Sequence, residues 1–235
     1  MSRPSVLVAW SSGKDSAWTL HQLRKDPAIQ VVGLLTTISR TERVVSIHGV
    51  SEQLVEAQAA AAGLPLKKVW IPSPCSNVEY EQALGSALAE AVGQGVTHLA
   101  FGDLFLEDIR RYREASLRHP EVSLLFPLWG RQTRQLAKDM IDGGLRCVVT
   151  SVDTAQLDSS FAGSEFDHRL LAGLPAEVDA CGERGEFHTF VYDGPVFSRP
   201  IPVVRGKTRS DGRFHMMELS LPIGEHGQSR SPLGR

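Results

Sequence analysis

The chain has 235 residues, of which 42% are hydrophobic, and a formal charge of −2, values typical of one globular domain or of a domain with a smaller lobe. The near-neutral charge speaks against nucleic acid as a partner, and no apolar run is long enough to cross a membrane. Three cysteines without a C-x-x-C pair argue against a disulfide framework and a zinc site. Because no signal peptide precedes the first apolar run, we expect a cytoplasmic protein.

Apolar, β-branched runs alternate with amphipathic segments along residues 1–153. This alternation predicts an α/β fold whose sheet is mostly parallel and covered by helices on both faces. The expected strands are residues 6–9, 29–38, 66–71, 96–101, 122–128 and 147–152. The expected helices are residues 17–25, 51–62, 77–92, 107–118 and 133–141, with Asn77 as the N-cap of the third and a loop at residues 39–46.

The pattern changes after Asp153, where the segments become shorter and more polar. One helix is expected at residues 166–171. Period-two runs, separated by turn signals such as Ser210-Asp211-Gly212, predict antiparallel strands at residues 188–192, 196–204 and 214–221. We therefore divide the chain into residues 1–153, a smaller lobe of residues 154–221 and a disordered tail of residues 222–235.

A short run of small and charged residues, Trp10-Ser11-Ser12-Gly13-Lys14-Asp15-Ser16, connects the first expected strand to the first helix. Unpaired backbone N–H groups at a helix N-terminus favour an anion, and phosphate is the usual one. The three serine hydroxyls and the charge of Lys14 add further donors. Asp15 has the wrong sign for phosphate but suits Mg²⁺, which bridges carboxylates to phosphate oxygens.

This run is not a Walker A sequence, because it is shorter and an acid follows the lysine. It resembles the pyrophosphate-binding loop, S-G-G-x-D-S, of the N-type ATP pyrophosphatases, with Ser12 at the position of the first glycine. Serine adopts a left-handed backbone poorly, so either Ser12 has ordinary dihedral angles or the loop differs in shape. The alternative interpretation is a plain turn before a helix.

The segment Phe101-Gly102-Asp103 follows the fourth expected strand. Gly102 would permit close backbone approach, and Asp103 could bind a metal or a substrate amine. The alternative is a simple strand-to-helix connection whose acids are favoured by the helix dipole.

Two arginines on the next expected helix, Arg110 and Arg113, share one face because they are three residues apart. Such a pair can bind a carboxylate or a phosphate with bidentate hydrogen bonds. The alternative is a solvated charged face, which is what most charge runs form.

The segment from Cys181 to Phe190, Cys-Gly-Glu-Arg-Gly-Glu-Phe-His-Thr-Phe, combines two glycines, two acids, a thiol and a histidine. It precedes the antiparallel lobe, from which a loop could fold back over the open end of the sheet. The alternative is a hairpin approach with incidental acids. His188 here and His48 earlier in the chain are candidate proton acceptors, although single histidines are more often structural.

This segment, together with Asp193-Gly194-Pro195, resembles the C-terminal signature of the diphthine–ammonia ligases. The phosphate-binding run, Gly102-Asp103, the arginine helix and Phe126-Pro-Leu-Trp129 follow in the order of that family, so the resemblance covers about residues 5–200. The family pattern Glu-Gly-Gly-Glu-Tyr-Glu is changed here at Arg184 and His188, which indicates a divergent branch, of bacterial type, and leaves the identity of the acceptor open.

The resemblance implies a Rossmann-like parallel sheet of the adenine nucleotide α-hydrolase type with a small C-terminal antiparallel lobe. It also implies an ATP-dependent ligase: a substrate carboxylate attacks the α-phosphorus, pyrophosphate leaves, and ammonia attacks the acyl-adenylate. The partners would be ATP, Mg²⁺, ammonia and a carboxylate-bearing acceptor, either a protein side chain or a small molecule. A homodimer is one arrangement that the sequence leaves open.

The residues implied for each role follow from their positions in these motifs. ATP would contact Ser11, Ser12, Gly13, Lys14, Asp15, Ser16, Thr36, Ile38, Phe101, Gly102 and Asp103, with Asp15 and Asp103 on Mg²⁺. The catalytic residues would be Lys14, Asp15, Glu183 and Glu186. The acceptor side would contain Arg110, Arg113, Cys181, Gly182 and His188.

Two other classes of protein share the loop or the fold. A tRNA sulfurtransferase would need a persulfide-carrying cysteine and a basic surface, and the isolated cysteines and the net charge speak against it. A nucleotide-binding sensor would bind ATP without turnover, and release of pyrophosphate distinguishes it from an enzyme.

Overall fold

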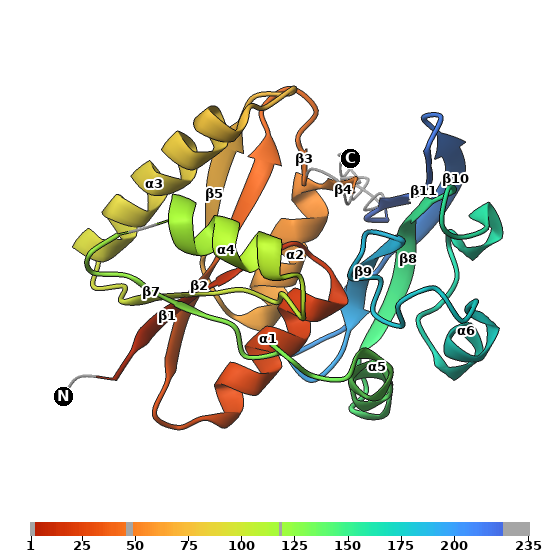
Figure 1. Ribbon diagram of the computed structural model, residues 1–235, viewed down its shortest axis with the longest axis horizontal. Coiled ribbons are helices and arrows are strands. Elements are labelled where there is room, and N and C mark those ends of the chain that lie inside the picture. The colour runs from red at the N-terminus through yellow and green to blue at the C-terminus, as the bar shows by residue number, and fades with distance from the viewer. Residues whose placement is uncertain (1–2, 46–48, 118, 223–235) are drawn as a thin grey trace, which may run out of the picture.

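The computed structural model describes residues 3–45, 49–117 and 119–222, and contains two separate sheets (Figure 1). His48 and residues 223–235, which include most of the expected tail, lie outside the described residues. The first sheet consists of β1 (Ser5–Ala9), β2 (Gln30–Ser39), β3 (Val44–Val45), β4 (Val50–Ser51), β5 (Leu66–Ile71), β6 (His98–Ala100) and β7 (Ser123–Leu125). The second consists of β8 (Arg146–Asp153), β9 (Phe187–Asp193), β10 (Val204–Ser210) and β11 (Phe214–Ser220).

Helices cover both sheets, as the alternation of segments predicts. They are α1 (Lys14–Lys25), α2 (Glu52–Ala62), α3 (Asn77–Gly93), α4 (Glu107–Ser116), α5 (Thr133–Asp142), the 3₁₀ helix η1 (Ser159–Phe161) and α6 (His168–Gly173). Helix α1 packs against both β1 and β9, so it lies where the two sheets meet. None of the helices in the described ranges is long and apolar enough to cross a membrane.

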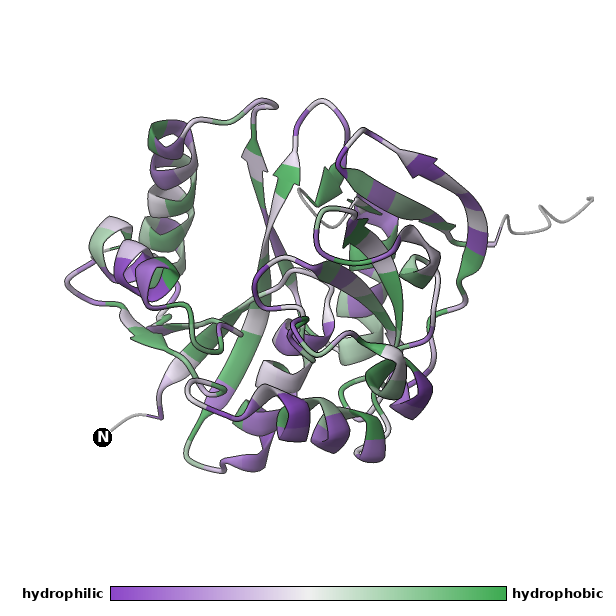
Figure 2. Ribbon diagram, turned by 45° about the vertical axis from the view of Figure 1, so that its right-hand side comes forward, coloured by the Kyte–Doolittle hydropathy of each residue, from purple (hydrophilic) through white to green (hydrophobic). Residues whose placement is uncertain are grey.

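The centre of the first sheet is β1, which pairs in parallel with β2 and with β6. Its residues Val6, Leu7 and Val8 are buried, because helices cover both of its faces. Strand β5 extends the sheet in parallel from β2, and β7 extends it from β6. This arrangement confirms the predicted α/β class with a mostly parallel sheet, and Figure 2 shows the hydrophobic colour concentrated on the strands inside the molecule.

Strand β8 was expected as the sixth strand of the parallel sheet, and this expectation is wrong. It pairs antiparallel with β9 on one side and with β11 on the other. Seven of its eight residues are buried, so its sequence reads as an apolar run like that of a parallel strand. The division of the chain at residue 153 stays a prediction, although the second sheet already begins at Arg146.

Several local expectations also differ from the structure. Residues 196–203 form no strand, since Pro200 and Pro202 have no backbone N–H to donate, and β10 begins only at Val204. The N-cap of α3 is Ser76 and not Asn77, because the Ser76 hydroxyl and the Glu79 side chain exchange hydrogen bonds with each other's backbone N–H in a capping box.

Two further differences concern short elements. The expected loop at residues 39–46 contains β3, which forms a hairpin with β4. The expected helix at 166–171 is α6, which begins two residues later, after Asp167 as the N-cap.

The second sheet ends in an exposed hairpin formed by β10 and β11. Every residue of β10 is exposed, and the strand carries Arg205, Lys207 and Arg209. Arg205 bonds the Gly163 carbonyl and pairs with Glu165, which fastens the outer strand to the segment before α6.

The buried amide of Gln58, on α2, connects the two sheets. Its Nε2 donates to the carbonyls of Ser12, at 3.0 Å, and Val191, at 2.6 Å, and its Oε1 accepts from Trp10 Nε1 at 2.8 Å. All three partners are buried, so bulk water does not replace the hydrogen bonds that Gln58 makes, although the Ser12 carbonyl also accepts from the Val191 N–H at 3.0 Å. Gln58 therefore joins the end of β1 to β9.

We expect Gln58→Ala to lower the free energy of unfolding by about 2–4 kcal/mol, because it leaves the buried indole N–H of Trp10 without its partner and removes one hydrogen bond from each of two buried carbonyls. Urea unfolding followed by circular dichroism measures this difference. Gln53→Ala is the control, since Gln53 lies on the same helix but is exposed, and it should change stability by less than about 0.5 kcal/mol. Equal effects of the two substitutions would contradict the role assigned to Gln58.

Candidate active site

The phosphate-binding run forms a tight turn between β1 and α1, as its sequence predicts. Gly13 is the N-cap of α1, and Ser16 Oγ donates to the Gly13 carbonyl at 2.9 Å. Ser12 has a φ of 74°, the left-handed conformation that the glycine of the related pattern adopts readily. The side chain of Ser12 is fully buried and its Oγ has no hydrogen-bond partner. Serine in place of the glycine therefore keeps the shape of the turn, but at a cost in backbone strain and in an unpaired hydroxyl group.

A cavity of about 630 Å³ opens beside this turn, at the carboxyl ends of β1, β2, β5 and β6. This volume lies in the range of small-molecule sites. Nine of the residues predicted for the site line it: Ser11, Asp15, Ser16, Phe101, Gly102, Asp103, Arg113, Glu183 and His188. The structure therefore gathers residues from four separate sequence motifs around one space.

The other predicted residues do not line this cavity: Ser12, Gly13, Lys14, Thr36, Ile38, Arg110, Cys181, Gly182 and Glu186. On β2 the difference is one of alternation, because successive side chains of a strand point to opposite faces. Leu35 and Thr37 line the cavity, whereas Thr36 and Ile38 are buried on the other face. Thr37 was thus missed by one position.

Lys14 is buried behind the turn instead of facing the cavity. Its Nζ lies 2.8 Å from Asp15 Oδ2 and also donates to the carbonyl of Cys181. The rings of Phe166 and Phe187 lie beneath it, 5.7 and 5.5 Å from Nζ to the ring centroids. Burial by itself lowers the pKa of Lys14, but the Asp15 carboxylate and smaller contributions from other neighbours together raise it above its ordinary value, so Lys14 stays charged.

Asp15 Oδ1 is buried and has no hydrogen-bond partner, although Oδ2 is paired with Lys14. A carboxylate oxygen in this state, at the wall of a cavity, is suited to a cation. Among the described residues no group of three or more His, Cys, Asp or Glu side chains is arranged to hold a metal ion by itself. A cation here would therefore need most of its ligands from a bound molecule and from water.

Gly102 allows the end of β6 to approach the phosphate-binding turn, as its sequence position suggests. A Cβ at this position would lie 2.9 Å from the backbone carbonyl carbon of Asp15, which is closer than real Cβ contacts allow. The next residue, Asp103, is held by Arg113 through two hydrogen bonds of 2.6 and 3.0 Å. Both oxygens of Asp103 are thus engaged with α4 across the mouth of the cavity.

Arg110 and Arg113 do not act as one pair. Arg113 lines the cavity and lies over the ring of Phe101, 4.2 Å from its centroid. Arg110 instead lies 4.8 Å from the ring centroids of both Phe126 and Trp129, and pairs with Glu114. Of the two predicted arginines, only Arg113 is in contact with the site.

Glu183 brings the C-terminal region into the cavity. Its Oε1 accepts hydrogen bonds from the backbone N–H groups of Leu104, at 2.7 Å, and Phe105, at 3.4 Å. Burial raises the pKa of Glu183 to about 7, the N–H of Leu104 opposes this increase, and the charge of Asp15 adds to it. Glu183 can therefore exchange a proton near neutral pH.

His188, on β9, also lines the cavity. Burial lowers its pKa to about 4, and the charge of Lys14 acts in the same direction. The imidazole is therefore neutral at pH 7 and can donate or accept a hydrogen bond there.

The second glutamate of the C-terminal segment, Glu186, is buried outside the cavity. It accepts hydrogen bonds from the backbone N–H groups of Asp179, at 2.8 Å, and Arg184, at 2.9 Å. The thiol of Cys181 is also buried and donates to the Thr133 carbonyl, and burial raises its pKa. Both side chains stabilise the turn that carries Glu183.

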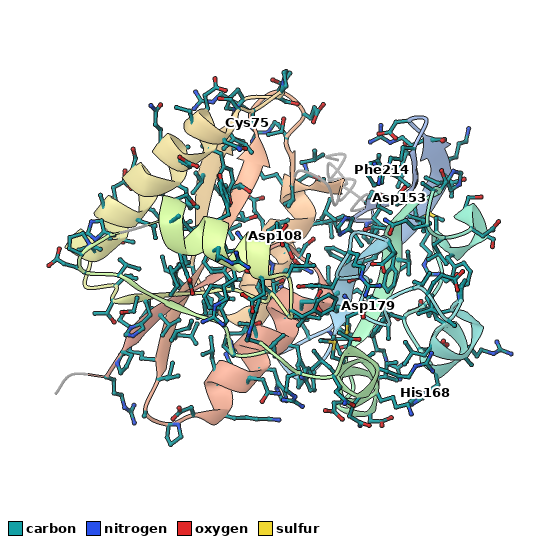
Figure 3. All side chains as sticks on the ribbon, in the orientation of Figure 1. Cys75, Asp108, Asp153, His168, Asp179 and Phe214 are labelled. Atoms are coloured by element: carbon teal, nitrogen blue, oxygen red, sulfur yellow. The ribbon has the colours of Figure 1, made fainter. Side chains whose placement is uncertain are left out.

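Sequence reasoning missed residues whose role depends on distant partners. Asp179, labelled in Figure 3, accepts hydrogen bonds within the turn that carries Glu183, and Thr189 Oγ1 accepts from the Lys14 N–H at 3.1 Å. Tyr80, in the first turn of α3, and Cys75, just before that helix, also line the cavity. No local pattern marks these residues, although the rigid Pro-Ser-Pro segment before Cys75 follows a strand end, where sites form.

A parallel sheet with a phosphate-binding turn at the end of its central strand, and a cavity at the carboxyl edge, defines a Rossmann-like PP-loop protein. The family model of the diphthamide synthase N-terminal domain matches residues 4–118, and that of the diphthamide synthase C-terminal domain matches residues 132–220. The chain belongs to the diphthine–ammonia ligase family.

Curated relatives named diphthine–ammonia ligase match this chain over most of their length. A diphthine–ammonia ligase of Danio rerio is 29% identical over 194 residues, which cover 74% of this chain and 73% of that protein. The Bos taurus enzyme of the same name is 25% identical over 221 residues, with 84% and 82% covered. That of Homo sapiens is 24% identical over 241 aligned positions, with 93% and 88% covered.

We expect Ser12→Gly to raise the free energy of unfolding by about 0–1 kcal/mol, because it relieves the left-handed backbone and removes a buried hydroxyl without a partner. Ser11→Gly is the control at the neighbouring position, where the hydroxyl accepts from the Gly13 N–H, and it should destabilise by about 0.5–1.5 kcal/mol. Thermal or urea unfolding measures both. Clear destabilisation by Ser12→Gly would show that the Ser12 side chain has a role that the structure does not reveal.

Proposed function

We propose that the protein is an ATP-dependent, amide-forming ligase. An acceptor carboxylate attacks the α-phosphorus of ATP, pyrophosphate leaves, and ammonia then attacks the acyl-adenylate. The observation that carries the proposal is that one cavity is lined both by the phosphate-binding turn and by Glu183. The names of the relatives, diphthine–ammonia ligases, support an amidation with ammonia.

The nucleotide side of the cavity would be the turn from Ser11 to Ser16. Backbone N–H groups at the start of α1 and the hydroxyls of Ser11 and Ser16 would bind the β- and γ-phosphates. The adenine would lie against β2, next to Thr37, with Phe101 and Gly102 close by. Lys14 would offset the charge of the leaving pyrophosphate from behind the turn, and direct contact would require its release from the Cys181 carbonyl.

Mg²⁺ fits the nucleotide side in one respect: Asp15 offers a buried, unpartnered carboxylate oxygen. Asp103 is engaged with Arg113 and would become a second ligand only by leaving it. When bound, the ion would offset the negative charge of the phosphates next to Asp15. The remaining ligands would be phosphate oxygens and water.

The acceptor side would be formed by Glu183, His188 and Arg113. Of the acids that line the cavity, Asp103 is paired with Arg113 and Asp15 with Lys14, so an ammonium ion near the acyl-adenylate would be attracted mainly by Glu183. Ammonium must lose a proton before it attacks a carbonyl group, and Glu183, with a pKa of about 7, can accept it. Arg113 is the cation in place to orient the acceptor carboxylate.

The products of ATP test this proposal. With ammonium and an acceptor carboxylate, chromatography of the spent nucleotide should show AMP, and a coupled assay should show pyrophosphate. ADP and phosphate as the main products would contradict the proposal. ATP binding without turnover, over a screen of metabolites and protein pools, would indicate the nucleotide-binding sensor instead.

The sulfurtransferase alternative is tested through the cysteines. Cys75 lines the cavity, whereas Cys147 and Cys181 are buried. Burial raises the pKa of the Cys75 thiol, and Glu79 adds to the effect, so it is a weak nucleophile. An amide-forming enzyme should keep most of its activity in Cys75→Ser, and a sulfurtransferase that uses this thiol should lose nearly all of it.

We expect Glu183→Gln to lower kcat by about 10²-fold or more, the scale for loss of a general base, with the Kd of Mg-ATP changed only a few-fold. In the wild type, activity should rise as the pH increases through about 7, because a base must be deprotonated to act. This part of the pH profile should be absent in the variant. Steady-state kinetics and calorimetry give both quantities.

Glu177→Gln is the matched control, because Glu177 lies shortly before Cys181 in the chain but is exposed. It should leave kcat, the pH profile and the Kd of Mg-ATP close to those of the wild type. If Glu183→Gln abolishes Mg-ATP binding but keeps turnover at saturating ATP, Glu183 belongs to the nucleotide side.

A further inference from the structure

The turn that carries Glu183 is held by a carboxylate that does not reach the cavity. Asp179 Oδ1 accepts from the backbone N–H groups of Cys181, at 2.9 Å, and Glu183, at 3.3 Å. Its Oδ2 accepts from the hydroxyl of Thr133, on α5, at 2.5 Å. The carboxylate thus fixes the turn from inside and attaches it to a helix.

The backbone groups of Asp179 also form hydrogen bonds within the turn. The Asp179 N–H donates to Glu186, and the Asp179 carbonyl accepts from the Gly182 N–H at 2.9 Å. Gly182 has a φ of 67°, and a Cβ there would lie 2.7 Å from the Phe187 carbonyl oxygen. These constraints give the turn one shape, since a side chain at Gly182 would not fit.

In this shape the turn directs two of its groups, the carbonyl of Cys181 and the carboxylate of Glu183, toward other parts of the site. The carbonyl of Cys181 meets Nζ of Lys14, behind the phosphate-binding turn. Two residues later, the carboxylate of Glu183 accepts a hydrogen bond from the N–H of Leu104, in the segment that follows β6. The Asp179 carboxylate bonds the backbone N–H of both residues, Cys181 and Glu183.

We propose that Asp179 is a positioning residue that holds Glu183 at the acceptor side and Cys181 at Lys14. This inference rests on the proposed function for its kinetic consequence, but not for its structural one. Without the Asp179 carboxylate, the turn loses the two bonds that fix its inner side, and Glu183 is no longer held on Leu104. A displacement of about 1 Å can cost 10²-fold in rate.

The nature of the side chain makes the proposal specific. The two bonds to the turn are both made by Oδ1, and an asparagine can accept them with its own carbonyl oxygen. These two hydrogen bonds do not need the negative charge of Asp179. That charge is unfavourable for Asp15: burial raises the pKa of Asp15, and the charge of Asp179 raises it further. Asp179→Asn should therefore keep the position of Glu183, whereas Asp179→Ala should lose it.

The experiment compares Asp179→Ala, Asp179→Asn and Thr133→Val in the full-length protein. Amide hydrogen exchange at Leu104 reports directly whether Glu183 still accepts its hydrogen bond. In Asp179→Ala this amide should exchange at least about tenfold faster, kcat should fall about 10²-fold, and the Kd of Mg-ATP should stay within about threefold. Glu183→Ala should give the same loss of protection at Leu104.

Asp179→Asn should restore protection at Leu104 and most of kcat, which a requirement for negative charge would not allow. Thr133→Val removes only the bond to Oδ2 and should resemble the wild type. Unchanged exchange at Leu104 in Asp179→Ala would overturn the proposal, as would equal losses in Asp179→Ala and Asp179→Asn. If Asp179→Ala does not fold, Asp179→Glu takes its place: it keeps the charge but moves the carboxylate by one methylene group, so protection at Leu104 should fall, and unchanged protection would overturn the proposal.

The failure of the proposed function would look different. If the wild type forms no amide with any acceptor, the exchange at Leu104 still decides whether Asp179 holds Glu183 in place.

Discussion

The structure of the site depends on the buried ammonium group of Lys14. A buried charge is stable only when it is paired, and Lys14 finds its partners in two places: Asp15 on its own helix and the Cys181 carbonyl from the C-terminal turn. Its backbone N–H donates to Thr189 on β9. The phosphate-binding turn and the second sheet are therefore fixed relative to each other by the same residue.

This arrangement explains why the site is built from both ends of the chain. Gln58 bonds the carbonyls of Ser12 and Val191, which adds a second connection between the phosphate-binding turn and β9. Glu183 reaches the segment after β6. A change in the C-terminal turn would thus alter the hydrogen bonds of Lys14 at the start of α1, some 170 positions earlier in the sequence.

The parts of the structure that local sequence signals determine were predicted correctly. The turn before α1, the parallel strands and the approach of Gly102 each follow from a pattern of neighbouring residues. Strand β2, by contrast, is buried on both faces along its second half, so its sequence has no alternation that tells Thr36 from Thr37. Burial on both faces also led β8 to be placed in the wrong sheet.

The sequence also does not reveal which of the two glutamates of the C-terminal segment lines the cavity, and the reason here is a different one. Glu183 and Glu186 are three residues apart in a turn with glycines at positive φ, and no periodic pattern decides which side chain faces the cavity. The decision lies in partners distant in the sequence, such as Leu104 for Glu183. Asp179 and Gln58 were missed for the same reason, since each is identified only by what it bonds.

The exposed outer strand β10 has a consequence for how molecules of this protein meet one another. An open strand edge is a template on which another chain can add a strand, and this leads to aggregation. On β10 the residues Arg205, Lys207 and Arg209 place charged side chains along this edge, with Arg205 paired to Glu165 and Arg209 to Glu218. Two copies that approached edge to edge would have to remove water from these charged side chains, and that cost opposes uncontrolled self-association.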